Sequence, residues 1–163
     1  IHLRRDPISV ASSFYSIGSV PGKTTLGSLY LIDPHRTDNV LSIGNVLDKD
    51  PNFSDDLYRC LWYWYETEAR VVRLCEQHPE LSLMHLATDD LNQPDRVQDL
   101  LRFLNLSHLA DAVLPKVGLR ANEKSDEKQR TVDREKAIEM NEQLVQMLGE
   151  RFDSRYIQVV SSS

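Results

Sequence analysis

The chain has 163 residues and a formal net charge of −6, with 40% apolar and 27% charged side chains. This length and composition predict one soluble globular domain with a substantial core. The acidic balance argues against a general nucleic-acid binder, which would be basic overall. It leaves room for a phosphate ligand, because a few well-placed arginines suffice to bind one. No apolar run approaches the ~20 residues of a membrane span, and no signal-peptide pattern is visible.

The chain begins with a pattern typical of a strand that turns directly into a helix. Residues 1–3 are a short apolar strand end, followed by Arg4-Arg5-Asp6-Pro7. Residues 7–17 predict a helix with a proline in its first turn. The region 18–53 is rich in turn residues, which predicts a long loop of the kind often used as a lid or docking surface. Within it we expect a short helix or strand at 26–32 and a short helix at 40–47.

The second half of the chain contains the most regular helical patterns. A long helix is predicted over 54–77, with Ser54 as its N-cap and an apolar stripe at helical spacing. Both cysteines lie on this helix, too far apart for a disulfide, and are expected to be buried thiols. Beyond it we expect the following elements: a buried strand at 81–86, a turn at Asp89-Asp90-Leu91, helices at 94–104, 108–114 and 132–148, an exposed, mobile polar loop at 118–131, an extended tail at 156–160 and frayed residues at 161–163.

The order of these elements predicts an α/β fold with a parallel sheet, in one domain over 1–160. Only two strands are evident, and two parallel strands make a poor sheet by themselves. The chain also opens with isoleucine in what reads as the middle of a strand. We therefore expect a fragment, a processed chain or one half of a larger fold.

The junction between the first strand and helix is a candidate anion site. Ligands of open α/β sheets bind beyond the carboxyl ends of the strands, where helix N-termini present backbone N–H groups and a positive dipole end. Arg5 and Ser13 add side-chain donors there, and Arg4 is a weaker candidate. The alternative is a pair of surface arginines and an ordinary helical serine.

Other motifs favour structural interpretations. The segment Gly18–Thr25 (GSVPGKTT) resembles a phosphate loop, but it is one residue short and follows a helix, so a polar turn is expected. The five histidines show no metal-ligand spacing, and His85 is expected to be a satisfied core histidine. Four consecutive aromatic residues, 62–65, predict a helix that is covered on several sides. Asp89 and Asp90 are expected to cap a turn or pair with a nearby arginine, not to bind a metal.

The segment RRDPISVASSF resembles the 3'-phosphate-binding segment of the PAPS-dependent sulfotransferases, in which a serine stands eight residues after the arginine. Arg5 and Ser13 have this spacing. The similarity continues through the long helix, the strand near 81–86, the Asp89-Asp90-Leu91 turn and the phrase Phe103-Leu104-Asn105-Leu106. In order, the matching pieces cover about residues 1–110.

The resemblance implies a partial P-loop-like three-layer fold and transfer of a sulfuryl group from PAPS to a hydroxyl or amine, without a metal. Arg5 and Ser13 would bind the 3'-phosphate, and Arg120 and Lys124 are the nearest, poor match to the family's basic glycine loop. In the family, the 5'-phosphosulfate loop and the catalytic base precede the Arg-Asp-Pro segment, so no catalytic residue is assigned. We expect a missing N-terminal half or a partner chain to supply them.

Two other functions remain open at this stage. One is a catalytically inactive, sulfotransferase-derived subunit that serves as a structural or docking part of a larger assembly. The other is a fragment of a P-loop kinase or another nucleotide-binding protein, which the short Gly18–Thr25 segment disfavours.

Overall fold

A computed structural model describes residues 1–118 and 131–157 of the chain. The described chain is mostly helical and has a two-stranded parallel sheet, which confirms an α/β fold at the coarse level. It divides into two compact units. The sheet unit comprises Ile1–Arg5 and Glu80–Glu127, and the helical unit comprises Asp6–Pro79 and Lys128–Ser163.

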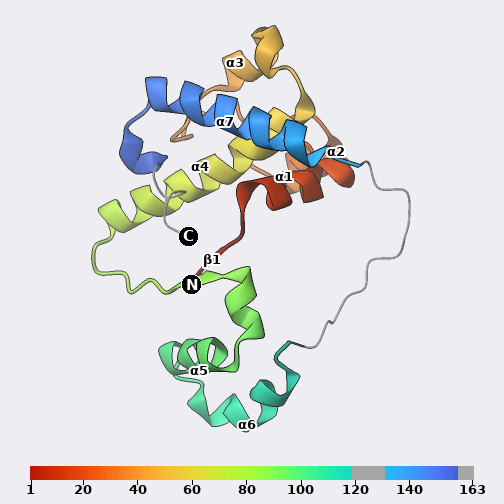
Figure 1. The fold of residues 1–163 in the computed structure, drawn as a ribbon. Helices are drawn as coiled ribbons and strands as arrows, with labels where there is room; N and C mark the ends of the chain where they lie inside the picture. The colour runs from red at the N-terminus through yellow and green to blue at the C-terminus, as the bar shows by residue number, and fades with distance from the viewer. Residues whose placement is uncertain (119–130, 158–163) are drawn as a thin grey trace. The chain divides into compact units, whose positions relative to one another are not determined.

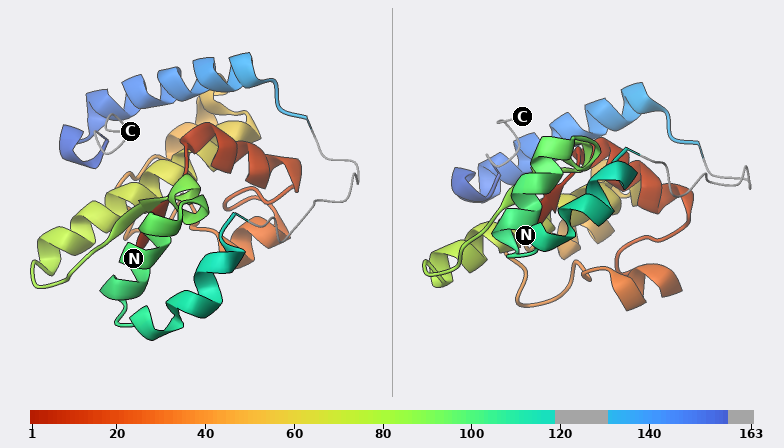
Figure 2. Two further views of the ribbon diagram at one scale, coloured as in Figure 1. Left: turned by 60° about the horizontal axis from the view of Figure 1, so that its bottom comes forward. Right: turned by 90° about the horizontal axis from the view of Figure 1, so that it is seen from below.

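The sheet unit is built on two short parallel strands. Strand β1 spans His2–Arg4 and strand β2 spans His85–Ala87. Their register pairs His2 with His85, Leu3 with Leu86 and Arg4 with Ala87. After β2 the chain continues through a series of short helices, which Figure 2 shows in green to teal: η2 (Thr88–Asn92), α5 (Pro94–Phe103), η3 (Ser107–Leu109), α6 (Ala110–Val113) and η4 (Leu114–Lys116). Val97 and Leu101 form the buried face of α5, four residues apart as a helix requires.

The helical unit is built around one long helix, α4 (Asp56–Gln77), which packs against α1 and α7 (Figure 1). Its other elements are α1 (Pro7–Ser16), α2 (Thr25–Tyr30), α3 (Gly44–Lys49), η1 (Pro51–Phe53), α7 (Arg134–Arg151) and η5 (Ser154–Tyr156). The expected aromatic cluster on α4 is covered as predicted, since Trp62, Trp64 and Tyr65 are buried. Leu144 and Leu148 of α7 are fully buried in the same core.

The two cysteines of α4 are both free, but only one of them is fully enclosed. Cys60 is completely buried, and this burial raises the pKa of its thiol to about 12. Cys75 is half-buried, because the apolar stripe of α4 loses its cover toward the C-terminal end. At neutral pH the Cys60 thiol therefore stays protonated and serves as a small apolar side chain.

Several predicted boundaries shift in the structure. Asp55, not Ser54, caps α4, accepting a hydrogen bond from the Leu57 N–H at 2.9 Å. The prediction of a buried strand at 81–86 is wrong for its first residues. Strand β2 begins only at His85, and Leu81 is 49% exposed. Tyr156 ends the short helix η5 and does not begin an extended tail.

The remaining expected elements are found with smaller changes. The element expected at 26–32 is the helix α2, which begins one residue earlier, at Thr25, and ends at Tyr30. The helix expected at 40–47 begins only at Gly44. The helix expected at 108–114 is split into η3, α6 and the start of η4. Most of the polar loop at 118–131 and the last residues of the chain lie outside the described residues.

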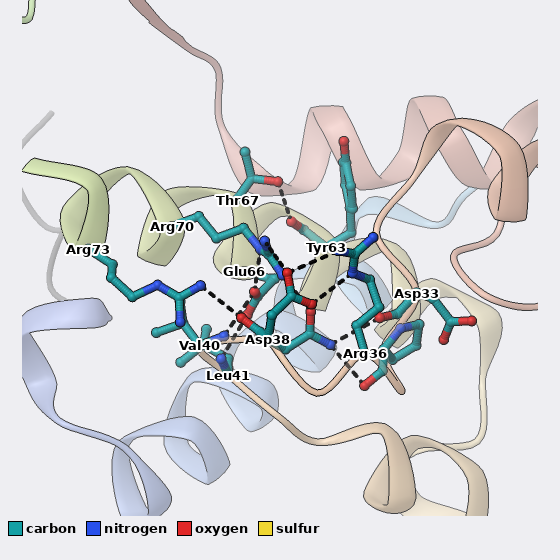
Figure 3. A network of polar contacts seen from close by, with 12 residues as sticks. Asp33, Arg36, Asp38, Val40, Leu41, Tyr63, Glu66, Thr67, Arg70 and Arg73 are labelled. Atoms are coloured by element: carbon teal, nitrogen blue, oxygen red, sulfur yellow. Dashed lines mark hydrogen bonds and ion pairs between the residues drawn. The ribbon is translucent and has the colours of Figure 1, made fainter. Parts of the chain in front are cut away.

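The loop between α2 and α3 is fixed to α4 by a buried carboxylate (Figure 3). Glu66 is fully buried, and its two oxygens accept hydrogen bonds from the backbone N–H groups of Val40, at 3.0 Å, and Leu41, at 2.7 Å. Arg70, one helical turn further along, donates its Nε–H to Glu66 at 2.7 Å. Trp62 of α4 also donates to the Leu41 carbonyl oxygen at 2.7 Å. These bonds satisfy backbone groups that the loop would otherwise bury unpaired.

We expect Glu66→Gln to destabilise the helical unit by about 2–4 kcal/mol, somewhat less than breaking a fully buried ion pair, because Arg70 keeps some contact with water. The amide keeps the shape of the side chain, but its NH2 group must face one of three hydrogen-bond donors. Urea unfolding monitored by tryptophan fluorescence measures the change.

The matched control is Glu76→Gln, the same substitution at an exposed position of α4, where the carboxylate pairs with Arg155. This variant should cost less than about 1 kcal/mol, as exposed ion pairs do. Equal losses in the two variants would contradict the special role of Glu66.

Candidate functional site

The carboxyl edge of the parallel sheet is where the predicted anion site begins. Arg4 ends β1 and is paired with Ala87, the last residue of β2, so the two strands end at the same level. Arg5 follows directly and is exposed, whereas Arg4 is half-buried. This places an exposed arginine residue at the edge where open α/β sheets bind ligands.

The β2 side of this edge is closed by a carboxylate of the chain itself. Asp90 in η2 accepts the Ala87 N–H at 2.8 Å and pairs with Arg96 of α5 at 3.3 Å. The backbone N–H and then Arg96 lower the pKa of Asp90 below its ordinary value of 3.8. The expectation that the Asp89-Asp90 pair caps a turn and binds an arginine is therefore confirmed for Asp90.

The N-terminus of α1 is partly occupied by its own cap. Asp6 accepts a hydrogen bond from the Ser9 N–H at 2.8 Å, and Pro7 occupies the first turn, where its missing N–H costs nothing. One of the backbone donors expected to face an anion is therefore already used, and a negative charge already stands at the positive end of the helix.

The structure places the predicted site residues in different parts of the chain. Arg4 and Arg5 belong to the sheet unit, whereas Ser13 belongs to the helical unit, so no single unit brings them together. Ser13 lies on α1 and is half-buried, and within the described ranges its hydroxyl has no hydrogen-bond partner. Arg120 and Lys124 lie outside the described residues.

The segment Gly18–Thr25 forms a structural turn. The Thr24 hydroxyl oxygen accepts the N–H groups of Val20, at 2.9 Å, and Gly27, at 3.2 Å, and so caps α2. Lys23 pairs with Asp56 of α4 at 2.6 Å. A Cβ at Gly27 would lie 1.8 Å from the Val20 carbonyl oxygen, so only glycine allows this close approach. The interpretation as a polar turn fits these bonds.

The structure corrects the expectation for one histidine and gives contacts for two others. His85 is exposed, not a core histidine, because Leu86 is the residue of β2 that points into the core and its neighbours point the other way. Its Nδ1 lies 3.1 Å from the Nδ1 of His2 on β1. His35 pairs through Nε2 with Asp48 at 2.8 Å, and Asp48 also pairs with the buried Arg59.

A second polar cluster, around Asp38, was not predicted from the sequence (Figure 3). Arg36 contacts its carboxylate through two nitrogens, at 2.8 and 3.0 Å, and Arg70 approaches it at 3.3 Å. Arg73 donates to the Asp38 backbone oxygen at 2.8 Å. The hydrogen bond from Arg36, followed by that from Arg70, holds the pKa of Asp38 well below its ordinary value. The spacing of Glu66 and Arg70 was the only local signal, since the loop partners lie at least 25 residues away.

Comparison of the chain with protein-family models, with curated proteins and with solved structures finds no match in any of the three. No helix in the described part of the chain has the length and apolar character needed to cross a membrane. Within 1–118 and 131–157, no group of three histidine, cysteine or acidic side chains is arranged to hold a metal ion.

Asp90 should give the fold a measurable dependence on acid. Its folded-state pKa lies below its ordinary value of 3.8, so its contribution to stability is complete above that pH and is lost as the pH falls through the folded-state pKa. We expect Asp90→Asn to be less stable than the parent chain at pH 6, with the difference shrinking as the pH falls below the ordinary pKa of 3.8 and through the lower folded-state pKa. Chemical denaturation at a series of pH values measures both effects.

The control is Asp89→Asn, the neighbouring residue, which makes no hydrogen bond to the described residues. A pH-independent difference between Asp90→Asn and the parent chain would contradict this prediction, as would an equal effect at Asp89.

Proposed function

We propose that this chain is the 3'-phosphate-binding part of a sulfotransferase, which transfers a sulfuryl group from PAPS to a hydroxyl or amine. The observation that carries the proposal is the place of Arg5, exposed directly after β1 at the carboxyl edge of a parallel sheet and followed by the proline-initiated helix α1. A partial P-loop-like three-layer fold is part of the proposal. Its support is the parallel pairing of β1 with β2, which are separated in sequence by α1 and α4.

The ligand and the residues are chemically matched. A 3'-phosphate is a dianion, and charge-assisted hydrogen bonds from a guanidinium are the strongest that a protein offers it. Arg5 supplies that charge, and Ser13, eight residues later, supplies the hydroxyl donor that the motif assigns. Because Asp6 caps α1, the helix N-terminus adds less than an uncapped one would.

Within this proposal, Arg5 and Ser13 are positioning residues. The 3'-phosphate lies at the opposite end of the nucleotide from the sulfur, so binding it orients the cofactor and leaves the transfer step to other groups. We assign no catalytic residue to the described residues. The general base and the 5'-phosphosulfate contacts belong to the part of the enzyme that the resemblance places before Arg5.

We expect Arg5→Ala to weaken binding of adenosine 3',5'-bisphosphate by about 1.5–3 kcal/mol, the contribution of a charged hydrogen bond, or about 10- to 150-fold in Kd. Ser13→Ala should cost less, about 0.5–1.5 kcal/mol, as a neutral donor does. Titration calorimetry with the parent chain and each variant measures both losses. Adenosine 5'-monophosphate, which lacks the 3'-phosphate, should bind the parent chain and Arg5→Ala with the same affinity.

Arg102→Ala serves as the matched control, since it removes an exposed arginine of α5 that pairs with Asp99 in the same unit. Its affinity for the bisphosphate should stay within twofold of the parent value. Unchanged affinity in Arg5→Ala would overturn the assignment of this residue. Failure of the parent chain to prefer the bisphosphate over the monophosphate would favour the inactive docking subunit instead.

A further inference from the structure

Helix α1 has an apolar face and a hydroxyl face, and Ser13 belongs to the second. The residues of α1 that pack against the core of the helical unit are Ile8, Val10, Ala11, Phe14 and Tyr15. With about 3.6 residues per turn, the positions left on the other side of the helix are serines: Ser9, Ser12, Ser13 and Ser16. Ser16 donates its hydroxyl to the Ser13 carbonyl oxygen at 2.9 Å and is therefore used within the helix. The direction of the Ser13 hydroxyl thus depends on how α1 is rotated against the core.

The two ends of α1 are fixed by hydrogen bonds. At its start, Asp6 accepts the Ser9 N–H at 2.8 Å. At its end, the Ser19 N–H donates to the Phe14 carbonyl oxygen at 2.9 Å. The turn that makes this second bond contains Gly18 with a φ of 70°, a left-handed conformation that glycine adopts at little cost. The length of α1 is therefore fixed, and its rotation is left to side-chain packing.

One aromatic contact between α1 and α4 lies next to Ser13 in the chain. The ring of Phe14 meets the ring of Tyr63 edge to face, with centroids 5.4 Å apart and planes at 87°. This is a preferred geometry for two aromatic rings. Figure 3 shows the Tyr63 ring extending from α4 toward α1. Ala11, one turn earlier in α1, is completely buried, and its small side chain allows α1 to pack closely on α4.

We propose that Phe14 and Tyr63 are positioning residues, which direct the Ser13 hydroxyl toward the 3'-phosphate by fixing the rotation of α1. This inference rests on the proposed function, in which Ser13 is a phosphate donor. The two rings act only through Ser13 and make no contact with the nucleotide. A change in the rotation of α1 moves the hydroxyl sideways, and a hydrogen bond weakens steeply when its donor and acceptor are misaligned. The contact therefore sets the preference for a nucleotide that carries a 3'-phosphate.

The experiment is a double-mutant cycle between Phe14 and Ser13, followed by titration calorimetry with adenosine 3',5'-bisphosphate and adenosine 5'-monophosphate. Phe14→Leu should weaken binding of the bisphosphate about two- to fivefold, and no more than Ser13→Ala does, because it misaligns one neutral donor. Binding of the monophosphate should not change. In the Ser13→Ala background, the same leucine substitution should change the Kd by less than about 1.5-fold, as expected when one residue acts through the other.

A second pair of variants tests the α4 side of the contact. Tyr63→Leu removes the ring and should reproduce the effect of Phe14→Leu on the bisphosphate. Tyr63→Phe keeps the ring and should retain the parent affinity. The matched control is Phe53→Leu, which removes the edge-to-face contact of another half-buried phenylalanine in the same unit, with Tyr58 at a centroid distance of 4.9 Å. This variant should bind both nucleotides as the parent chain does.

The outcomes separate this inference from the proposed function. Equal losses from Phe14→Leu in the parent and in the Ser13→Ala background would overturn the positioning role. A loss shared by both nucleotides would overturn it too, since that is the effect of general destabilisation. If Ser13→Ala weakens bisphosphate binding and Phe14→Leu does not, only the positioning role fails. If Ser13→Ala binds as the parent chain does, the assignment of Ser13 fails, and the positioning role fails with it.

Discussion

The buried carboxylate of Glu66 is the interaction on which the helical unit most depends. An ionised side chain removed from water is costly unless every one of its oxygens is bonded, and Glu66 meets this condition with two backbone N–H groups and Arg70. The bonds fix residues 40 and 41 against α4. From there Arg70 and Arg73 extend the contact to Asn39 and Asp38. These contacts hold the loop between α2 and α3 in place along α4.

The same constraint explains what could and could not be read from the sequence. Helices α1, α4, α5 and α7 follow from local sequence signals, such as apolar spacing and a proline in the first turn, which act within a few residues. The hydrogen bonds of Glu66 join residues that are separated by 25 and 26 positions in the sequence. No periodic pattern predicts such a pair. The start of α4 was missed by one residue because Ser54 and Asp55 are both good caps. The apolar run 81–86 suggested a full strand, but only the part that pairs with β1 is extended in a ladder.

For the candidate site, the sequence predicted the position of Arg5 better than its surroundings. The strand, the turn and the proline-initiated helix are found where the motif requires them. The role of Asp6 was missed, although an aspartate before proline at a helix start is a common cap signal. This cap changes the electrostatics of the site, since it places a carboxylate where the helix would otherwise attract an anion. In the proposed site, the guanidinium of Arg5 would then be the main source of affinity for a phosphate.

The proposed recognition of a 3'-phosphate by Arg5 and Ser13 can be tested by chemical-shift mapping. The ¹⁵N-labelled chain would be titrated in parallel with adenosine 3',5'-bisphosphate and adenosine 5'-monophosphate. We expect shifts of the Arg5 side-chain N–H and the Ser13 amide that appear with the bisphosphate and are absent with the monophosphate. Equal shifts with both nucleotides, or shifts confined to the arginines around Asp38, would contradict it.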